Sequence, residues 1–293
     1  MTTLTETLPL EARFARWFGH TIRVPKARRL PWFLYPPTSR RARVRTNARL
    51  RNGQTFGVDT RSFLEWVLWV YGEYEPDTQA IIRRYLRPGD VAIDVGANIG
   101  IHTMPMSEAV GPQGVVLAVE PLPAVRERLE RNLALNRATN VRVIAQAASD
   151  REGSAQLYPP RADAANWGQA SLARLSHLDP GAPIEVPLVT LDALVRAQGL
   201  DRVRLIKVDV EGHDREVMAG AIALIDRYHP VLIFEFSPEH TSEIGNDWDD
   251  TVGLLVRQRA YRLSEMWRGA LNPLDERPPR RQCMVLGLPP GLD

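Results

Sequence analysis

The sequence has very little cysteine, with Cys283 as the only one among 293 residues. A single thiol excludes an intrachain disulfide and also a metal cluster held by several thiolates. This composition suits a reducing compartment, so we expect a cytoplasmic protein. Glu6 and Glu11, with no long apolar core beside them, argue against a cleaved secretory signal.

Long hydrophobic runs are also missing. The longest one near the start, Trp66 to Tyr71, is far too short to span a bilayer. We therefore expect no transmembrane segment.

Acidic residues are absent from positions 12 to 58, a stretch that holds many arginines and is called the basic arm below. Because the whole chain has a net charge of only +2, the remainder is net acidic. The arm is suited to an acidic or phosphate-bearing acceptor, or to an anionic membrane touched through Trp32, Phe33 and Tyr35. The alternative is a solvated surface that packs against the acidic remainder or against a second subunit in a homo-oligomer.

The stretch Val91 to Gly100 is the most informative motif. It reads as a buried strand that runs into Asp94 and then into a turn containing Gly96 and Gly100. The spacing is G-x-x-x-G, not the G-x-G-x-x-G that places backbone amides against a pyrophosphate. Asp94 would repel a phosphate but would accept hydrogen bonds from an ammonium group. These features favour S-adenosylmethionine as the ligand.

A second apolar strand, Val115 to Val119, ends in Glu120 and Pro121. An acid at this position is suited to the two hydroxyls of a ribose. Ala148, after a third strand, is small enough for an adenine ring to lie close to it, although a plain exit from the strand explains it equally well. The predicted cofactor-binding residues are Asp94, Gly96, Ala97, Asn98, Gly100, Thr103, Glu120, Pro121, Ala148 and Asp209.

Strands and helices alternate along the chain, which predicts an α/β fold with a mostly parallel sheet. Within this order, Ile184 to Val189 is predicted as an extra or edge strand, and His213 to Asp226 as one helix. We expect two parts. Residues 1–75 form a basic N-terminal extension with a hairpin through Asn52-Gly53 and a helix, acting as a substrate lid or an interface. Residues 76–293 form the cofactor-binding domain, closed by an antiparallel pair of late strands.

Candidate catalytic residues lie at or just after the carboxyl ends of the fourth and fifth core strands, because ligands of an open parallel sheet bind there. They are Asp209, Glu211, His213 and Glu235. Strand alternation places Lys207, Asp209 and Glu211 on one side, and the buried Lys207 requires a carboxylate partner.

Each candidate also has a purely structural interpretation. His213 is a candidate general base, because the ordinary pKa of histidine suits proton transfer near neutrality. The alternative is that it is a surface residue at the start of a helix. Asp209 and Glu211 belong to the site, or they cap that helix. Asp209 and Glu235 together would suit magnesium, but two acids are weak evidence, so no metal ligand is assigned.

Five segments between roughly residues 72 and 236 carry a recognisable pattern. They are, in order, GEYEPDTQAIIRRYLRPGDVAIDVGANIGIHT, VEPLPAVRERLERNLALN, VPLVTLDAL, LIKVDVEGHDREVMAGA and HPVLIFEF. Together they resemble the FkbM family of class I S-adenosylmethionine-dependent methyltransferases. The resemblance implies a Rossmann-like, mostly parallel seven-stranded sheet with helices on both faces. It also implies O-methylation of a hydroxyl on a small molecule such as a sugar, a polyketide or another secondary metabolite. The loop around Trp167 would then lie near the acceptor, and the alternative is a mobile surface loop without that role.

Two other classes of function stay open: an NAD-dependent oxidoreductase and a catalytically silent module that binds a ligand in the same cleft. Nucleic acid is not an expected partner. Methyltransferases acting on amino groups of bases carry an Asn/Asp-Pro-Pro-aromatic motif after the fourth strand, where this chain has DVEGH.

Overall fold

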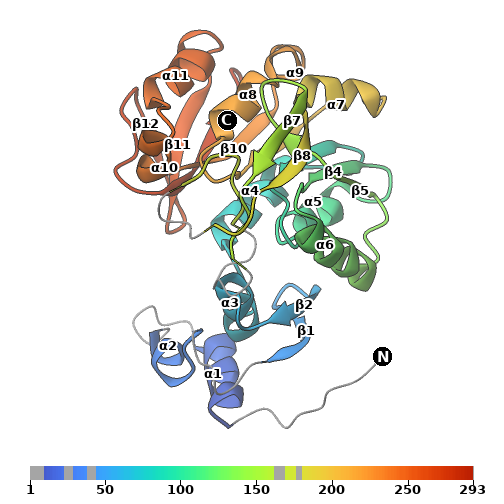
Figure 1. The fold of residues 1–293 in the computed structure, drawn as a ribbon, viewed down its shortest axis with the longest axis vertical. Coiled ribbons are helices and arrows are strands. Elements are labelled where there is room, and N and C mark those ends of the chain that lie inside the picture. Colours follow the sequence, from blue (N-terminus) through green and yellow to red (C-terminus); the bar gives the residue numbers. More distant parts are fainter. Residues whose placement is uncertain (1–9, 23–28, 38–43, 162–168, 176–179, 293) are drawn as a thin grey trace. The chain divides into compact units, whose positions relative to one another are not determined.

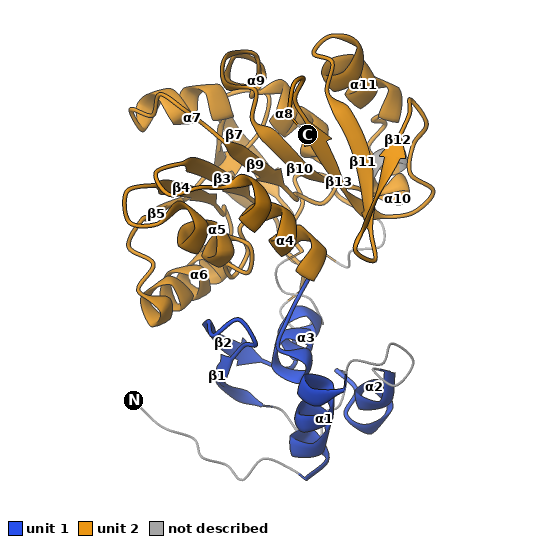
Figure 2. Cartoon of the chain, turned by 180° about the vertical axis from the view of Figure 1, so that it is seen from behind, with its two compact units in different colours: residues 1–75, 162–167 blue, residues 76–161, 168–293 orange. Residues whose placement is uncertain are grey.

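The computed structural model describes residues 10–22, 29–37, 44–161, 169–175 and 180–292. The described residues up to Glu75 form one compact unit, unit 1, and those from Pro76 onward form another, unit 2 (Figure 2). Among the described helices, none combines the length and apolarity that a membrane crossing requires.

Unit 1 packs three helices and a hairpin. Its elements are α1 (Leu10–Thr21), α2 (Leu30–Leu34), β1 (Arg45–Arg49), β2 (Thr55–Asp59) and α3 (Phe63–Tyr71). The predicted hairpin is confirmed, with Arg45 opposite Asp59 and Arg49 opposite Thr55. Its turn is not the expected two-residue type, because the Gly53 amide donates to the Leu50 carbonyl and only Gly53 has a positive φ.

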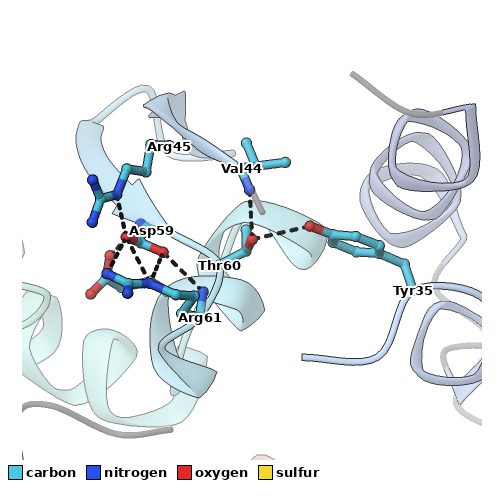
Figure 3. A network of polar contacts seen from close by, with 7 residues as sticks. Tyr35, Val44, Arg45, Asp59, Thr60 and Arg61 are labelled. Atoms are coloured by element: carbon cyan, nitrogen blue, oxygen red, sulfur yellow. Dashed lines mark hydrogen bonds and ion pairs between the residues drawn. The ribbon is translucent and has the colours of Figure 1, made fainter. Parts of the chain in front are cut away.

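Three described arginines of the basic arm make contacts inside unit 1. The Arg16 guanidinium donates to the Trp69 carbonyl at 3.0 Å, and that of Arg51 donates to the Gly19 carbonyl at 2.7 Å. Arg45 and Arg61 both bind the Asp59 carboxylate (Figure 3). These contacts make part of the arm's charge structural.

The aromatic residues of the arm divide between core and surface. Tyr35 is buried and its hydroxyl lies 3.0 Å from that of Thr60, so it is not available for the membrane contact proposed from sequence (Figure 3). Trp32 and Phe33 are 44% and 78% exposed. Of the three aromatic residues, only Trp32 and Phe33 are exposed enough to touch a membrane surface.

The main sheet of unit 2 has eight strands in the order β12-β11-β13-β10-β9-β3-β4-β5. Its parallel strands are β3 (Val91–Val95), β4 (Val115–Val119), β5 (Val141–Ile144), β9 (Leu205–Val208) and β10 (Val231–Phe236). The antiparallel strands are β11 (Arg262–Trp267), β12 (Ala270–Leu274) and β13 (Cys283–Leu288). Seven strands were predicted, and β12 is an additional edge strand.

Helices cover both faces of this sheet, as predicted (Figure 1). They are α4 (Pro76–Tyr85), α5 (Thr103–Val110), α6 (Pro123–Asn136), α7 (Leu191–Ala197), α8 (Asp214–Ala219), α9 (Ile222–Tyr228), α10 (Pro238–Glu243) and α11 (Trp248–Val252). Successive strand residues point to opposite faces, so Ile93 packs with α7, α8, α9 and α11, whereas Ala92 packs with α4 and α5.

Two parts of unit 2 differ from the sequence expectation. The strand expected as an extra or edge strand, β8 (Ile184–Val189), lies in a separate small sheet between β6 (Ala147–Ala148) and β7 (Gly153–Leu157). The helix expected from His213 to Asp226 is broken into α8 and α9 at Gly220. A Cβ at Gly220 would lie 2.0 Å from the Ser149 carbonyl oxygen, so the chain must approach closely there.

Candidate active site

Asp94, near the end of β3, is fully buried and sits in a polar network. Its Oδ2 accepts a hydrogen bond from the Thr103 hydroxyl at 2.6 Å, and its Oδ1 lies 3.5 Å from Lys207 Nζ. Burial raises the pKa of Asp94, while the Lys207 charge acts in the opposite direction. The carboxylate partner expected for Lys207 is thus present, and Asp209 is a second one at 3.2 Å.

The loop after β3 brings the predicted cofactor region against the end of β9. The amides of Gly96 and Ala97 both donate to the Val119 carbonyl, which fixes the loop to the end of β4. Gly96 has φ +72°, and a Cβ there would lie 1.9 Å from the Asp209 carbonyl oxygen. Glycine is required at this position because any side chain would separate the loop from Asp209.

The remaining loop residues hold its shape. Asn98 has φ +51°, and its side chain accepts a hydrogen bond from the Ile99 amide. Gly100 has φ +96° and lies against Leu129 of α6. These are backbone conformations that favour glycine and asparagine, which explains the sequence of the turn.

Glu120 follows β4 and is 6% exposed. Its Oε2 accepts from the Asn98 amide and its Oε1 from the Leu122 amide, both at 2.9 Å. Burial raises its pKa to about 7, although both hydrogen bonds oppose that shift. Each carboxylate oxygen has a second lone pair, so the group retains capacity to accept hydrogen bonds. Pro121 beside it accepts a hydrogen bond from Arg126 through its carbonyl.

Ala148 is buried in β6, paired with Val189, and Ser149 follows it. The Ser149 hydroxyl lies 3.0 Å from His213 Nε2, and the Glu216 carboxylate lies 3.5 Å from His213 Nδ1. Both ring nitrogens of His213 therefore have protein neighbours. Burial lowers the pKa of His213, which keeps the imidazole neutral near pH 7.

Asp209 lies just beyond β9, next to Gly96 in space. Its side chain is 30% exposed, whereas those of Asp94 and Lys207 are 0% and 1% exposed. Lys207 binds its Oδ2. The Asp209 carboxylate is therefore held in one orientation by Lys207 and is still accessible to a ligand.

Glu211 does not continue the strand alternation predicted for it, because β9 ends at Val208 and Glu211 has φ +52°. Its Oε2 lies 3.7 Å from His240 Nδ1. Glu235, in β10, offers an oxygen to the same place, since ligand atoms of Glu211, Glu235 and His240 all lie within 4.8 Å of one another. The structure groups Glu235 with these two residues, whereas Asp209 binds Lys207.

Burial raises the pKa of Glu211 to about 7, with the Asp209 charge as the next cause. Burial also raises the pKa of Glu235 well above its ordinary value, and Asp209 and Glu211 add to the shift. Two acids this close do not both ionise easily without a compensating cation.

Sequence reasoning missed His240, Ser149 as a partner of His213, and Glu216. His240 stands in α10 shortly after β10, and the only available signal was a histidine just beyond a strand end. The predicted acceptor loop is described only from Gln169 onward, and Trp167 lies outside the described residues. Within the described part, the Gln169 side chain hydrogen-bonds to Glu211, and Ser171 Oγ donates to the Glu211 carbonyl at 3.2 Å.

The sequence is similar to those of known methyltransferases. Residues 94–263 match the model of the methyltransferase FkbM domain. The chain is 31% identical over 159 residues to the 31-O-demethyl-FK506 methyltransferase FkbM of Streptomyces tacrolimicus, covering 46% of this chain and 60% of that protein. It is 29% identical over 145 residues to the 2-O-methyltransferase NoeI of Sinorhizobium fredii, covering 46% and 58%.

A solved structure, that of methyltransferase FkbM from Methylobacillus flagellatus KT, superimposes with a TM-score of 0.45 at 15% identity, covering 75% of this chain and 52% of that one. The aligned region spans about three fifths of the length of the two curated relatives. More than half of this chain lies within the family match, which includes Asp94, Glu120 and the segment from Lys207 to Glu235. The chain therefore belongs to the FkbM methyltransferase domain family.

Proposed function

We propose that this protein transfers the methyl group of S-adenosylmethionine to a hydroxyl of a small molecule. The observation that carries the proposal is the placement of three acids at the carboxyl ends of neighbouring parallel strands. Asp94 and Glu120 are buried and held by hydrogen bonds, whereas Asp209 is accessible beside them. The names of two relatives, which specify O-methylation, support a hydroxyl acceptor.

The residues present fit the cofactor in their chemistry. Asp94 Oδ1 is buried and faces Lys207 Nζ at 3.5 Å, and its remaining lone pair can accept a hydrogen bond from the ammonium group of the cofactor. Glu120 presents two acceptor oxygens for the ribose hydroxyls, and Ala148 offers a small side chain near the adenine position. The turn from Gly96 to Gly100 would hold the methionine part.

When bound, S-adenosylmethionine supplies a methyl group on a positively charged sulfur, so the protein's task is mainly positioning and proton removal. We assign proton removal to Asp209. Lys207 holds its Oδ2, which leaves Oδ1 to accept the proton from the acceptor hydroxyl as the new carbon–oxygen bond forms.

His213 then acts as a positioning residue or as an alternative proton acceptor. The Ser149 hydroxyl and the Glu216 carboxylate occupy its two ring nitrogens, and a role as the base requires the Ser149 contact to open. We therefore expect His213→Ala to slow turnover without weakening cofactor binding. A cytoplasmic location and a homo-oligomer stay predictions.

The test combines calorimetry with methyl transfer. Purified protein is titrated with S-adenosylhomocysteine and then assayed with radiolabelled S-adenosylmethionine against a panel of sugars, polyketides and other hydroxylated metabolites. We expect cofactor binding, transfer to at least one hydroxyl, and a strong loss of turnover in Asp209→Asn with binding retained.

The other classes of function give different results in the same test. Tight binding of NAD in place of S-adenosylhomocysteine would contradict the proposal in favour of an oxidoreductase. Cofactor binding without transfer to any acceptor would favour a silent binding module.

A further inference from the structure

Three side chains of ligand type, from separate parts of unit 2, converge near Asp209, whose charge acts on two of them. Glu211 comes from the loop after β9, Glu235 from β10, and His240 from α10. One ligand atom from each, two carboxylate oxygens and the imidazole nitrogen, lie within 4.8 Å of one another. This spacing is compatible with a common ion at their centre.

The cluster is shielded from solvent. The side chains of Glu211 and His240 are 15% and 6% exposed. Glu211 Oε2 and Glu235 Oε2 are both inaccessible, and neither has a hydrogen-bond partner among the residues that the structure describes. The buried cation Lys207 is shared between Asp94 and Asp209. Two buried carboxylate oxygens without donors are unfavourable unless a proton or a metal cation joins them.

Surrounding residues hold the ligands in place, as the outer shell of a metal site does. Gln282 donates to Glu235 Oε1 at 2.7 Å, which leaves Oε2 as the free oxygen. Ser171 and Gln169 bind the backbone and the side chain of Glu211. Glu211 itself has φ +52°, a strained conformation of the kind found at functional sites.

Gly212 makes the approach of His240 possible. It has φ +93°, and a Cβ there would lie 2.9 Å from His240 Cβ. A side chain at this position would push α10 away from Glu211. The glycine of the segment DVEGH thus has a role that its place in the sequence did not reveal.

We propose that Glu211, Glu235 and His240 bind a divalent first-row transition-metal ion that contacts the acceptor hydroxyl. Two carboxylates with one imidazole suit Mn²⁺ or Zn²⁺ better than Mg²⁺, for which oxygen donors alone are typical. The role at the acceptor rests on the proposed function, whereas the binding of the ion does not. The ion lowers the pKa of the hydroxyl, and the proton passes to Asp209.

The first experiment measures metal binding directly. Full-length protein is treated with a chelator and titrated with Mn²⁺, with free Mn²⁺ followed by electron paramagnetic resonance, and Zn²⁺ and Mg²⁺ are added as competitors. We expect one Mn²⁺ per chain, displaced by Zn²⁺ but not by an equal concentration of Mg²⁺. Absence of stoichiometric binding, or equal displacement by Mg²⁺, would overturn the assignment.

Variants then locate the site. His240→Ala and Glu235→Gln should each weaken Mn²⁺ binding by at least about tenfold, since changes even to outer-shell groups of metal sites cost about 10- to 100-fold. Glu239→Gln is the matched control, because Glu239 is an exposed carboxylate next to His240 in α10. Wild-type affinity in both cluster variants, or an equal loss in Glu239→Gln, would contradict the site.

Calorimetry with S-adenosylhomocysteine on the same samples separates the two proposals. Retained binding shows that the variants are folded, because Asp94 and Glu120 are not part of the cluster. Metal binding without cofactor binding would refute the proposed function and leave the metal site intact. Cofactor binding without metal binding would refute the site alone.

Discussion

Lys207 is 1% exposed and lies within ion-pair distance of Asp94, which is 0% exposed. A buried charge is costly to leave alone, whereas a matched pair is close to neutral in its effect on stability. The pair lies between β3 and β9, where Asp94 and Lys207 are direct neighbours in the register. Its local effect is to fix the acid that the cofactor is proposed to contact.

Removing only the lysine tests this pair. Lys207→Met leaves Asp94 buried without its cation and should lower the free energy of unfolding by about 3–5 kcal/mol. The double variant Asp94→Asn with Lys207→Met should recover part of the loss. Urea unfolding measures both, with Arg202→Met as the control because Arg202 is exposed in a surface pair. If Lys207→Met has the same free energy of unfolding as the wild-type protein, the ion pair does not contribute to stability.

Glu120 makes cofactor binding dependent on pH. Its pKa of about 7 means that it is largely protonated at pH 6 and ionised at pH 8. Ribose hydroxyls donate more strongly to the ionised carboxylate, so affinity for S-adenosylhomocysteine should fall by up to about tenfold from pH 8 to pH 6. Calorimetry at both pH values measures the change. Glu120→Gln should bind more weakly and lose the trend, and an unchanged pH profile in that variant would exclude Glu120 as its source.

The same shift has a defined sign for stability. The pKa of Glu120 is raised in the folded protein, so the folded state holds a proton that the unfolded chain has released. The stability contributed by this group is complete below about pH 4, near the unfolded pKa, and is lost as the pH rises through about 7.

At the level of elements, the β1 and β2 hairpin is fastened to the start of α3 through Asp59. Its carboxylate accepts from Arg45 at 2.6 Å and from Arg61 at 3.0 Å. Burial alone would raise the pKa of Asp59, but the hydrogen bonds from Arg61 and Arg45 outweigh it and lower the pKa. This contribution to stability is present above about pH 4 and is lost as the pH falls through the lowered value.

Asp59→Asn removes the charge while it keeps the size. We expect amides of residues 45–59 to exchange faster with solvent at pH 7, corresponding to a loss of about 1–3 kcal/mol in local opening. Hydrogen exchange with mass spectrometry reports it by segment. Asp249→Asn is the control, since Asp249 is 64% exposed in its pair with Arg257. Equal exchange in both variants would mean that the Asp59 contacts do not hold the hairpin.

Most strands of the main sheet could be predicted because buried parallel strands leave continuous β-branched runs in the sequence. The break at Gly220 could not be, since its cause is a distant carbonyl, that of Ser149. The strand-end acids Asp94, Glu120 and Asp209 were identifiable from the same runs. The position of Glu211 depends on a left-handed backbone, and that of His240 on the approach of α10, and neither is encoded in a local pattern.

For the whole molecule, the increase in stability caused by an added ligand shows whether the folded protein binds that ligand. A ligand that binds only the folded state stabilises it by about 2.7 kcal/mol at a concentration of 100 times its dissociation constant. We expect S-adenosylhomocysteine to raise the unfolding temperature of the intact chain and to protect β3 and β4 from hydrogen exchange. NAD, tested at the same concentration, should do neither. Protection by NAD alone would reverse the choice of cofactor.

The contact between Gly96 and the Asp209 carbonyl has a consequence for engineering this protein. The two backbones meet without room for a methyl group. The conformations of the turn after β3 and of the segment that follows β9 therefore depend on each other. A designer who grafts the segment from Asp209 to His213 of a relative to change the acceptor would also have to transplant the turn from Gly96 to Gly100. Libraries that vary the two segments jointly should contain more folded members than libraries that vary either one alone.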